Sequence, residues 1–301
     1  MTSVLESAPT TYYTGRPRYE GANIGTWVGF KQFVYLAEDA VLQYYRDRGQ
    51  SPASLFHSHG IGLSFVEHSV RLPGPIYVDD LVHAQATLTS SGTFEDTFTV
   101  ILAVYRDGER VPVLKGRLRV AFVTEHAGGA GPTPEWLTGR VVAGLADLRP
   151  PASAPAGPRE GFTWSQSIPY PHCHFSDRIQ HSGYVRNLEE VVHRYLADQG
   201  ISIRRMLTER NWIPAVTRSQ VRILADAHME EELLTVFTVD DVIKDVMFAG
   251  RMDAYVERSG TLVHTATAAI THGYGVSQGP DAGQVAVIDP ETRSALLWAG
   301  R

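Results

Sequence analysis

The sequence predicts an α+β protein that consists of two copies of one structural unit. The chain is similar to itself when it is shifted by 151 residues, each copy contains a long amphipathic helix, and strand-like segments follow each helix. With 301 residues, the chain is long enough to form two domains of ordinary size.

The internal repeat keeps one register without a gap. Between positions 19 and 49, seven residues are identical to the residues found 151 positions further along the chain. These pairs include Tyr19 with Tyr170 and Glu38 with Glu189. Chance identities would not hold one register over such a length, so the two halves are predicted to share a fold.

Each copy is predicted to contain a long helix. Apolar residues recur at helical spacing between positions 30 and 44, and again between positions 184 and 195. Gly49 and Gly200 follow these segments, where a glycine commonly ends a helix. The two helices are therefore expected near residues 30–49 and 181–200, side by side.

Segments rich in β-branched and aromatic residues, separated by turn residues, indicate antiparallel strands. An extended stretch precedes each helix, at 10–19 and 162–170. The strands expected after the helices span 62–72, 77–89, 94–105 and 111–123 in the first copy, and 215–224, 232–239, 246–256 and 262–272 in the second. The order is therefore strand, helix and four antiparallel strands, twice.

We place the first unit at residues 1–125 and the second at 161–275. Residues 126–160 are rich in Pro, Gly and Ala and are expected to be a linker, in which 135–148 could form a short helix. Residues 276–301 form a tail without a clear signal.

The composition argues for an ordinary acidic protein rather than a nucleic-acid-binding one. The formal net charge is −6, and no apolar stretch is long enough to span a membrane. Cys173 is the single cysteine, so no internal disulfide can form. The first nine residues show no secretion signal. We expect a cytoplasmic protein with neither a nucleic-acid nor a membrane partner.

The order of elements resembles the hotdog fold, in which a curled antiparallel sheet wraps a long central helix, and two copies resemble a double hotdog. The similarity is to the 4-hydroxybenzoyl-CoA thioesterase-like family of acyl-CoA thioesterases. That family has a Tyr at the end of the first strand, an Asp four residues later, a His seven after that and a Glu eight after that. Those positions are Tyr170, His174, His181 and Glu189 in the second copy, and Tyr19, Asn23, Phe30 and Glu38 in the first.

The resemblance implies hydrolysis of an acyl-CoA or acyl-carrier-protein thioester without a cofactor. It also implies a site built by both units. The family's Asp is absent from both copies, and Phe30 cannot exchange a proton. The second copy keeps polar residues in this region, so we expect one site centred there. The first copy either contributes Asn23 to this site or serves mainly as a wall.

Thioester hydrolysis needs a base and donors for the developing oxyanion. We expect Asp177, which comes just before the second helix, to share a proton with His174 or His181, while N–H groups at the helix start bind the oxyanion. Asp177 could equally be a helix N-cap. Glu189 is interpreted either as a catalytic carboxylate or as a structural hydrogen-bonding group between the helices.

The acyl group is expected in a tunnel between the two helices. Trp27, Phe33 and Tyr184 would shape this tunnel, with Tyr170 at the substrate. His172 and His174 could bind a metal together with Asp177 or His181. The resemblance implies no metal, and we expect none.

Two other functions remain open. Hydratases and dehydratases of this fold act on related thioesters, but their Asp-x-Asn-x-x-His pattern is not kept around Asp177 and His181. A ligand-binding protein without activity is the third possibility, because both copies lack the family's Asp. The sequence does not decide the acyl group, the carrier or assembly into a homo-oligomer of double hotdogs.

Overall fold

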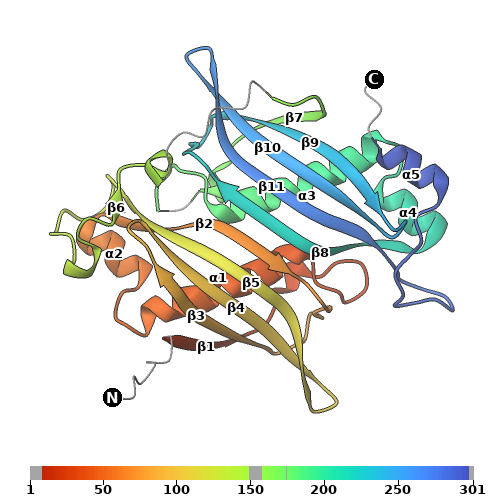
Figure 1. The fold of residues 1–301 in the computed structure, drawn as a ribbon, viewed down its shortest axis with the longest axis horizontal. Helices are drawn as coiled ribbons and strands as arrows, with labels where there is room; N and C mark the ends of the chain where they lie inside the picture. The colour runs from red at the N-terminus through yellow and green to blue at the C-terminus, as the bar shows by residue number, and fades with distance from the viewer. Residues whose placement is uncertain (1–8, 149–157, 174, 298–301) are drawn as a thin grey trace, which may run out of the picture.

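One continuous β-sheet carries two long helices on one side, as the computed structural model of residues 9–148, 158–173 and 175–297 shows (Figure 1). The first half contains β1 (Thr10–Gly15), α1 (Phe30–Arg46), α2 (Pro52–His59), β2 (Ile61–Arg71), β3 (Val82–Ser91), β4 (Glu95–Arg106) and β5 (Glu109–Thr124). The second half contains β7 (Phe162–Ser167), α3 (His181–Asp198), α4 (Ile203–Arg210), β8 (Trp212–Ile223), β9 (Glu232–Ile243), β10 (Met247–Arg258), β11 (Thr261–Val276) and α5 (Pro290–Leu296).

The two halves join through one pair of strands at the centre of the sheet. The strand order is β1-β3-β4-β5-β2-β8-β11-β10-β9-β7, so β2 and β8 connect two five-stranded halves with the same internal order. Ser69 pairs with Gln220 in this antiparallel register, and these residues are 151 positions apart. The two halves are therefore related by an approximate twofold axis that passes between these two residues.

The long helices α1 and α3 lie in contact on the inner side of the sheet, as predicted. Their apolar faces are buried, and this burial stabilises them more than intrinsic helix propensity does. Gly49 and Gly200 lie just beyond their ends with φ angles of +71° and +74°, a backbone conformation that glycine adopts without strain. The curled sheet wrapped around long helices is the predicted architecture, and it is confirmed.

The sequence analysis did not identify the shorter helices. The side chains of Ser51 and Ser202 cap α2 and α4 by accepting hydrogen bonds from the backbone N–H groups of Ser54 and Arg205. The predicted strand at 77–89 begins only at Val82, because a turn precedes it. In the tail, α5 is a further helix that was not predicted.

The segment between the halves contains short turns rather than the expected helix at 135–148. Two 3-10 turns, Glu135–Leu137 and Leu145–Leu148, flank the two-residue strand β6 (Val141–Val142), which pairs with β5 in parallel. Gly139 has a φ angle of +74°, which does not fit a continuous right-handed helix. The backbone reverses there and returns to the sheet.

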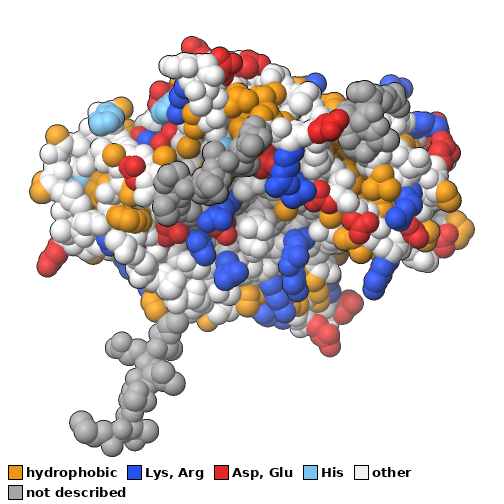
Figure 2. Space-filling model, turned by 45° about the horizontal axis from the view of Figure 1, so that its top comes forward, with side chains coloured by type: hydrophobic (Ala, Val, Ile, Leu, Met, Phe, Trp, Pro, Cys, Tyr) orange, Lys and Arg blue, Asp and Glu red, His pale blue; other side chains and the backbone are white. Residues whose placement is uncertain are grey.

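The outer face of the central strands is basic, whereas the inner face is apolar. Arg71 pairs with Lys115 on one side and with Arg218 on the other, and all three side chains are exposed. Figure 2 shows Lys and Arg side chains gathered near the middle of one face. Side chains alternate between the two faces of a strand, so the buried neighbours of these residues point towards the helices. The candidate site therefore lies on the inner side.

Candidate active site

A buried chain of four polar side chains runs from α1 to the centre of the sheet. Glu38 of α1 contacts His181 at the start of α3, with 2.5 Å between Oε1 and Nδ1. Nε2 of His181 lies 2.8 Å from Nδ1 of His68 on β2. Nε2 of His68 lies 2.9 Å from Oγ of Ser219 on β8. We call Glu38, His181, His68 and Ser219 the relay, and it takes two members from each half.

The hydrogen-bond pattern of the relay follows from its chemistry. An ionised Glu38 only accepts, so His181 must donate from Nδ1, and a neutral His181 then accepts at Nε2 from Nδ1–H of His68. Nε2 of His68 accepts in turn from the hydroxyl of Ser219. If His181 gains a proton, His68 changes tautomer and Ser219 becomes the acceptor. The relay can thus be fully hydrogen-bonded in both protonation states of His181.

Burial keeps His68 uncharged. Its side chain is fully buried, and desolvation, with a smaller contribution from the neighbouring His181, lowers the pKa of His68 well below its usual value. A neutral imidazole can donate one hydrogen bond and accept another, and it places no second charge beside His181. His68 therefore orients His181 rather than competing with it for a proton.

The first cavity lies against the relay. It has a volume of about 370 Å³ and is lined by both Glu38 and His181, together with apolar side chains from both halves. Among these apolar residues are Leu42, Leu63, Phe65, Leu145, Ile179 and Ile223. The exposed side chain of Arg46 also borders the cavity. Glu125 and Arg178 line the cavity as well, so it joins an apolar space to two carboxylates, of which Glu38 is paired with an imidazole.

Ion pairs hold the loop that leads into α3. The guanidinium of Arg178 lies 2.6 Å from Glu125 and 2.5 Å from Asp226, and all three side chains are largely buried. Glu125 follows β5 of the first half, and Asp226 follows β8 of the second. Desolvation of the buried carboxyl raises the pKa of Glu125 despite the opposing charge of Arg178. This triad fixes the start of α3, and therefore His181, against both halves.

The start of α3 offers donors to the same cavity. Gln180 is the N-cap residue, and its side chain makes no capping hydrogen bond. The first N–H groups of a helix have no partner within the helix, and the helix dipole favours negative charge there. His181 and Ser182 both line the first cavity. Their N–H groups can therefore stabilise an oxyanion that forms near Glu38.

The symmetry-related position has a different arrangement. Shifting by 151 residues replaces His181 by Phe30, and Glu38 by Glu189. Nζ of Lys31 donates a hydrogen bond to Oε2 of Glu189 at 2.8 Å. This interaction outweighs desolvation and raises the pKa of Lys31. A second cavity of about 830 Å³ lies here, but Glu189 in its wall is paired with a lysine rather than with an imidazole.

The residues expected for catalysis fall into different places. His181 lines the first cavity, whereas Glu189 lines the second one, together with Asn23. The Asp177 side chain is 63% exposed and pairs with His228, with 3.2 Å between its Oδ1 and Nδ1 of the imidazole. His174 lies outside the described residues. The structure thus brings His181 together with Glu38 rather than with Asp177.

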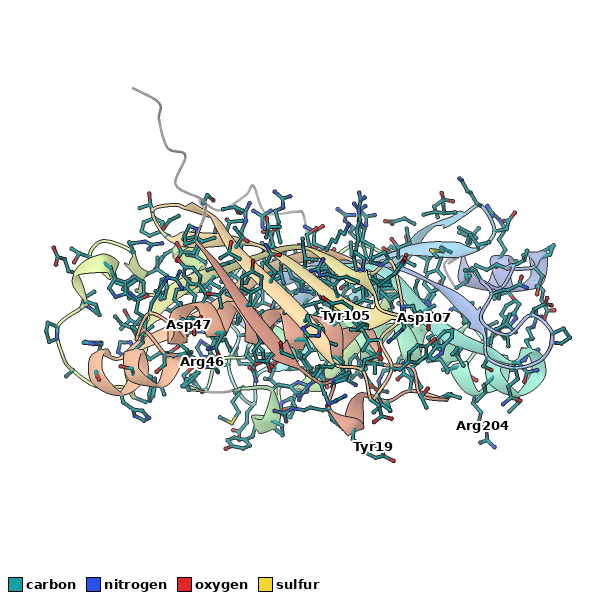
Figure 3. All side chains as sticks on the ribbon, turned by 90° about the horizontal axis from the view of Figure 1, so that it is seen from below. Tyr19, Arg46, Asp47, Tyr105, Asp107 and Arg204 are labelled. Carbon is teal, nitrogen blue, oxygen red and sulfur yellow. The ribbon has the colours of Figure 1, made fainter. Side chains whose placement is uncertain are left out.

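The residues expected to bind substrate are also dispersed. Trp27 and Phe33 line the second cavity, and Tyr184 is fully buried inside the second half, where it lines neither cavity. Tyr170 is 76% exposed. The equivalent Tyr19 projects away from the body of the molecule on the helix side (Figure 3).

Sequence reasoning missed His68 and underrated Glu38. Glu38 was noticed only as the counterpart of Glu189, and its real partner is 143 positions away in the other half. A signal was present, because His68 and Ser219 are themselves 151 positions apart. A buried imidazole opposite a buried hydroxyl at equivalent positions marks a polar contact near the twofold axis.

The described residues contain no group of three or more His, Cys, Asp or Glu side chains that could hold a metal ion. Among the helices in the described ranges, none is long and apolar enough to cross a membrane.

Comparison with known proteins supports the fold. Neither protein-family models nor curated proteins matched the sequence. Among solved structures, a 12:0-ACP thioesterase from Umbellularia californica is similar, with a TM-score of 0.62 at 8% identity over 88% of this chain and 97% of that one. A protein from Lactobacillus plantarum described as an oleoyl thioesterase has a TM-score of 0.61 at 11% identity, over 89% of this chain and 97% of that one.

An acyl-ACP thioesterase from Bacteroides thetaiotaomicron is also similar, with a TM-score of 0.56 at 10% identity over 87% of this chain and 97% of its own. These similarities extend over both halves of the chain rather than over a single unit. Together with the strand order and the paired helices, they show that the chain has the double hotdog fold.

Proposed function

We propose that this protein hydrolyses an acyl thioester in the first cavity. The observation that carries the proposal is the contact between Glu38 and His181, because it joins a carboxylate and an imidazole from the two halves at the wall of one apolar cavity. Thioester hydrolysis needs a base, donors for an oxyanion and space for an acyl group. The first cavity offers all three.

In the proposed reaction, Glu38 takes a proton from a water molecule, and this water attacks the thioester carbonyl carbon. The N–H groups at the start of α3 stabilise the negative charge on the carbonyl oxygen. The tetrahedral intermediate then collapses, the carbon–sulfur bond breaks, and the thiolate takes the proton held by Glu38 and His181. Glu38 thus takes the role that the sequence analysis gave to Asp177, while His181 keeps its role as proton partner.

The proposed substrate class is an acyl-CoA or an acyl-carrier-protein thioester. The apolar residues of the first cavity suit the acyl group, and Arg46 at its border suits a phosphate of the carrier. We also propose a cytoplasmic location, where both carriers are found. The single cysteine, which is buried, is consistent with a reducing compartment.

Hydration or dehydration of an enoyl or hydroxyacyl thioester is the second candidate. It is favoured by the same Glu38–His181 pair, because two proton-transfer groups beside one substrate could serve the addition or removal of water. The two reactions have different products. Incubation with saturated, hydroxyacyl and enoyl thioesters, with free thiol and enoyl absorbance followed together, separates them. Turnover of neither kind would leave a ligand-binding protein.

Two matched variants test the proposed base. Glu38→Gln should lower kcat by about 10²- to 10⁴-fold, because the amide cannot take a proton. Glu189→Gln makes the same change at the equivalent position of the other half, and kcat should stay within about twofold of wild type. Thiol release measures both, and circular dichroism verifies folding. Equal losses in the two variants would contradict the assignment of a single site.

A further inference from the structure

The second cavity differs from the first in a way that suits binding without reaction. Its volume of about 830 Å³ is more than twice that of the first cavity. The two cavities lie at equivalent positions of the two halves, and no described residue lines both. Where the first cavity has Arg178 and His181, the second has the apolar aromatics Trp27 and Phe30. A volume of this size is typical of a pocket for a small organic molecule.

The wall of the second cavity is largely apolar, and its two carboxylates, Glu189 and Glu190, are each paired with a basic side chain. Aromatic and aliphatic side chains from α1, α3 and the sheet surround the space, among them Phe33, Val192, Ile213 and Ile270. Glu189 forms a salt bridge with Lys31. His193 and His272 also line this cavity, but no imidazole of the described residues is hydrogen-bonded to Glu189 as His181 is to Glu38. Glu189 is therefore poorly placed to activate water.

One buried polar group in this cavity has no partner. His272 on β11 lines the second cavity, is 4% exposed, and has a buried Nδ1 with no hydrogen-bond partner among the described residues. The matching burial patterns of β5 and β11 place Val120 at the equivalent position of the first half. An imidazole thus stands where the other half has an aliphatic side chain. Buried polar groups in native proteins are usually hydrogen-bonded, so an unpaired imidazole at a cavity wall is available to a ligand in that cavity.

The protonation state of His272 selects the kind of ligand. Desolvation lowers the pKa of His272 to about 4, so the imidazole is neutral near pH 7. A neutral imidazole offers one donor and one acceptor but no charge. It therefore suits a hydroxyl group, which can both donate and accept, and it gives no ion pair to a carboxylate.

We propose that the second cavity binds an alkanol-like molecule, with an alkyl chain along the apolar wall and a hydroxyl group hydrogen-bonded to His272, and that this molecule is not turned over there. The proposal does not depend on the proposed hydrolysis, since it concerns a different cavity and a different imidazole. Trp27 lies in the cavity wall and provides a spectroscopic signal for binding.

The test compares 1-dodecanol with dodecane on the full chain. Binding is followed by tryptophan fluorescence and by calorimetry, and Trp27→Phe identifies the part of the fluorescence signal that comes from the cavity. We expect saturable binding of dodecanol, about fivefold tighter than binding of dodecane, which is the size of one neutral hydrogen bond. His272→Val inserts the residue found at the equivalent position, and it should remove this preference while leaving the alkane affinity unchanged.

Glu38→Gln is the matched control in the first cavity. It should abolish thiol release without changing the affinity for dodecanol. The proposal fails if neither compound binds, if His272→Val leaves the preference for dodecanol intact, or if Glu38→Gln weakens dodecanol binding. Dodecanol binding by a protein that hydrolyses no thioester would overturn the proposed function alone. If His272→Val does not fold, competition between dodecanol and dodecane in the wild-type chain, followed by calorimetry, still measures the preference, and equal affinities would contradict the proposal.

Discussion

Two imidazoles in series connect the carboxylate of Glu38 to the centre of the sheet. His68 does not line the first cavity, so it acts on the reaction only through His181. Its buried position leaves it one role, which is to hold the ring of His181 in the orientation and tautomer that face Glu38.

Replacing His68 should therefore affect kcat more than KM. His68→Phe removes the hydrogen bond to Nε2 of His181, and we expect kcat to fall by about 10- to 100-fold, the range for a hydrogen bond to a charged group. His68→Asn places an amide near the original Nδ1 and should recover part of the loss. Steady-state kinetics on both variants distinguish a positioning role from a purely structural one, in which Asn would be no better than Phe.

Replacing Asp177, in contrast to replacing His68, should have little effect on kcat. Its side chain is mostly exposed, its partner is His228, and it does not line the first cavity. Asp177→Asn should keep kcat within about twofold of wild type, since an exposed ion pair contributes little. The same thiol-release assay measures this. A folded but inactive Asn variant would return the role of base to Asp177.

At the scale of elements, the loop before α3 determines where His181 lies. Arg178 ties this loop to Glu125 and Asp226, and so to both halves. Arg178→Met keeps the length of the side chain but leaves two buried carboxylates unpaired. The free energy of unfolding should fall by about 3–5 kcal/mol, as measured by urea denaturation. Arg194→Met, which breaks an exposed pair with Glu190, is the control and should cost less than about 1 kcal/mol.

The sequence was sufficient to predict the long elements. The apolar period of α1 and α3 is strong because one face of each helix is buried over its whole length. Each of α2 and α4 has only eight residues, too few for a periodic signal. Their caps, Ser51 and Ser202, are 151 positions apart, so the repeat itself carried the missing information.

The site was harder to predict because its contacts cross between the halves. A shift by 151 residues shows which positions are equivalent, but it does not show which positions touch. Glu38 and His181 are not equivalent residues, and they meet only because the two helices pack side by side. Asp177 was expected to be the base because it comes just before the second helix and close to His181 in sequence, whereas Glu38 is 143 positions from His181.

At the scale of the whole molecule, buried neutral imidazoles make stability depend on pH. Burial lowers the pKa of His272 to about 4, whereas an unfolded histidine titrates near its usual value of about 6.5. As the pH falls below about 6.5, the imidazole of His272 binds a proton in the unfolded chain but stays neutral in the folded chain. Stability is therefore lost progressively between about pH 6.5 and pH 4.

His272→Val should reduce this loss by up to about 3 kcal/mol, because it removes one of the buried groups that must stay neutral. Urea denaturation at several pH values measures the difference. His193→Gln, which removes an exposed imidazole, is measured in parallel as the comparison variant. An identical acid sensitivity in His272→Val and wild type would show that His272 does not titrate in the expected way.

The hydrogen bond between His68 and Ser219 also indicates whether the relay or the duplication came first. These residues occupy equivalent positions of the two halves and meet near the twofold axis. In an ancestor made of two identical chains, each position would have met its own copy, as two histidines or as two serines. A histidine facing a serine is possible only when the two halves differ in sequence, as they do in this chain. The relay is therefore younger than the duplication.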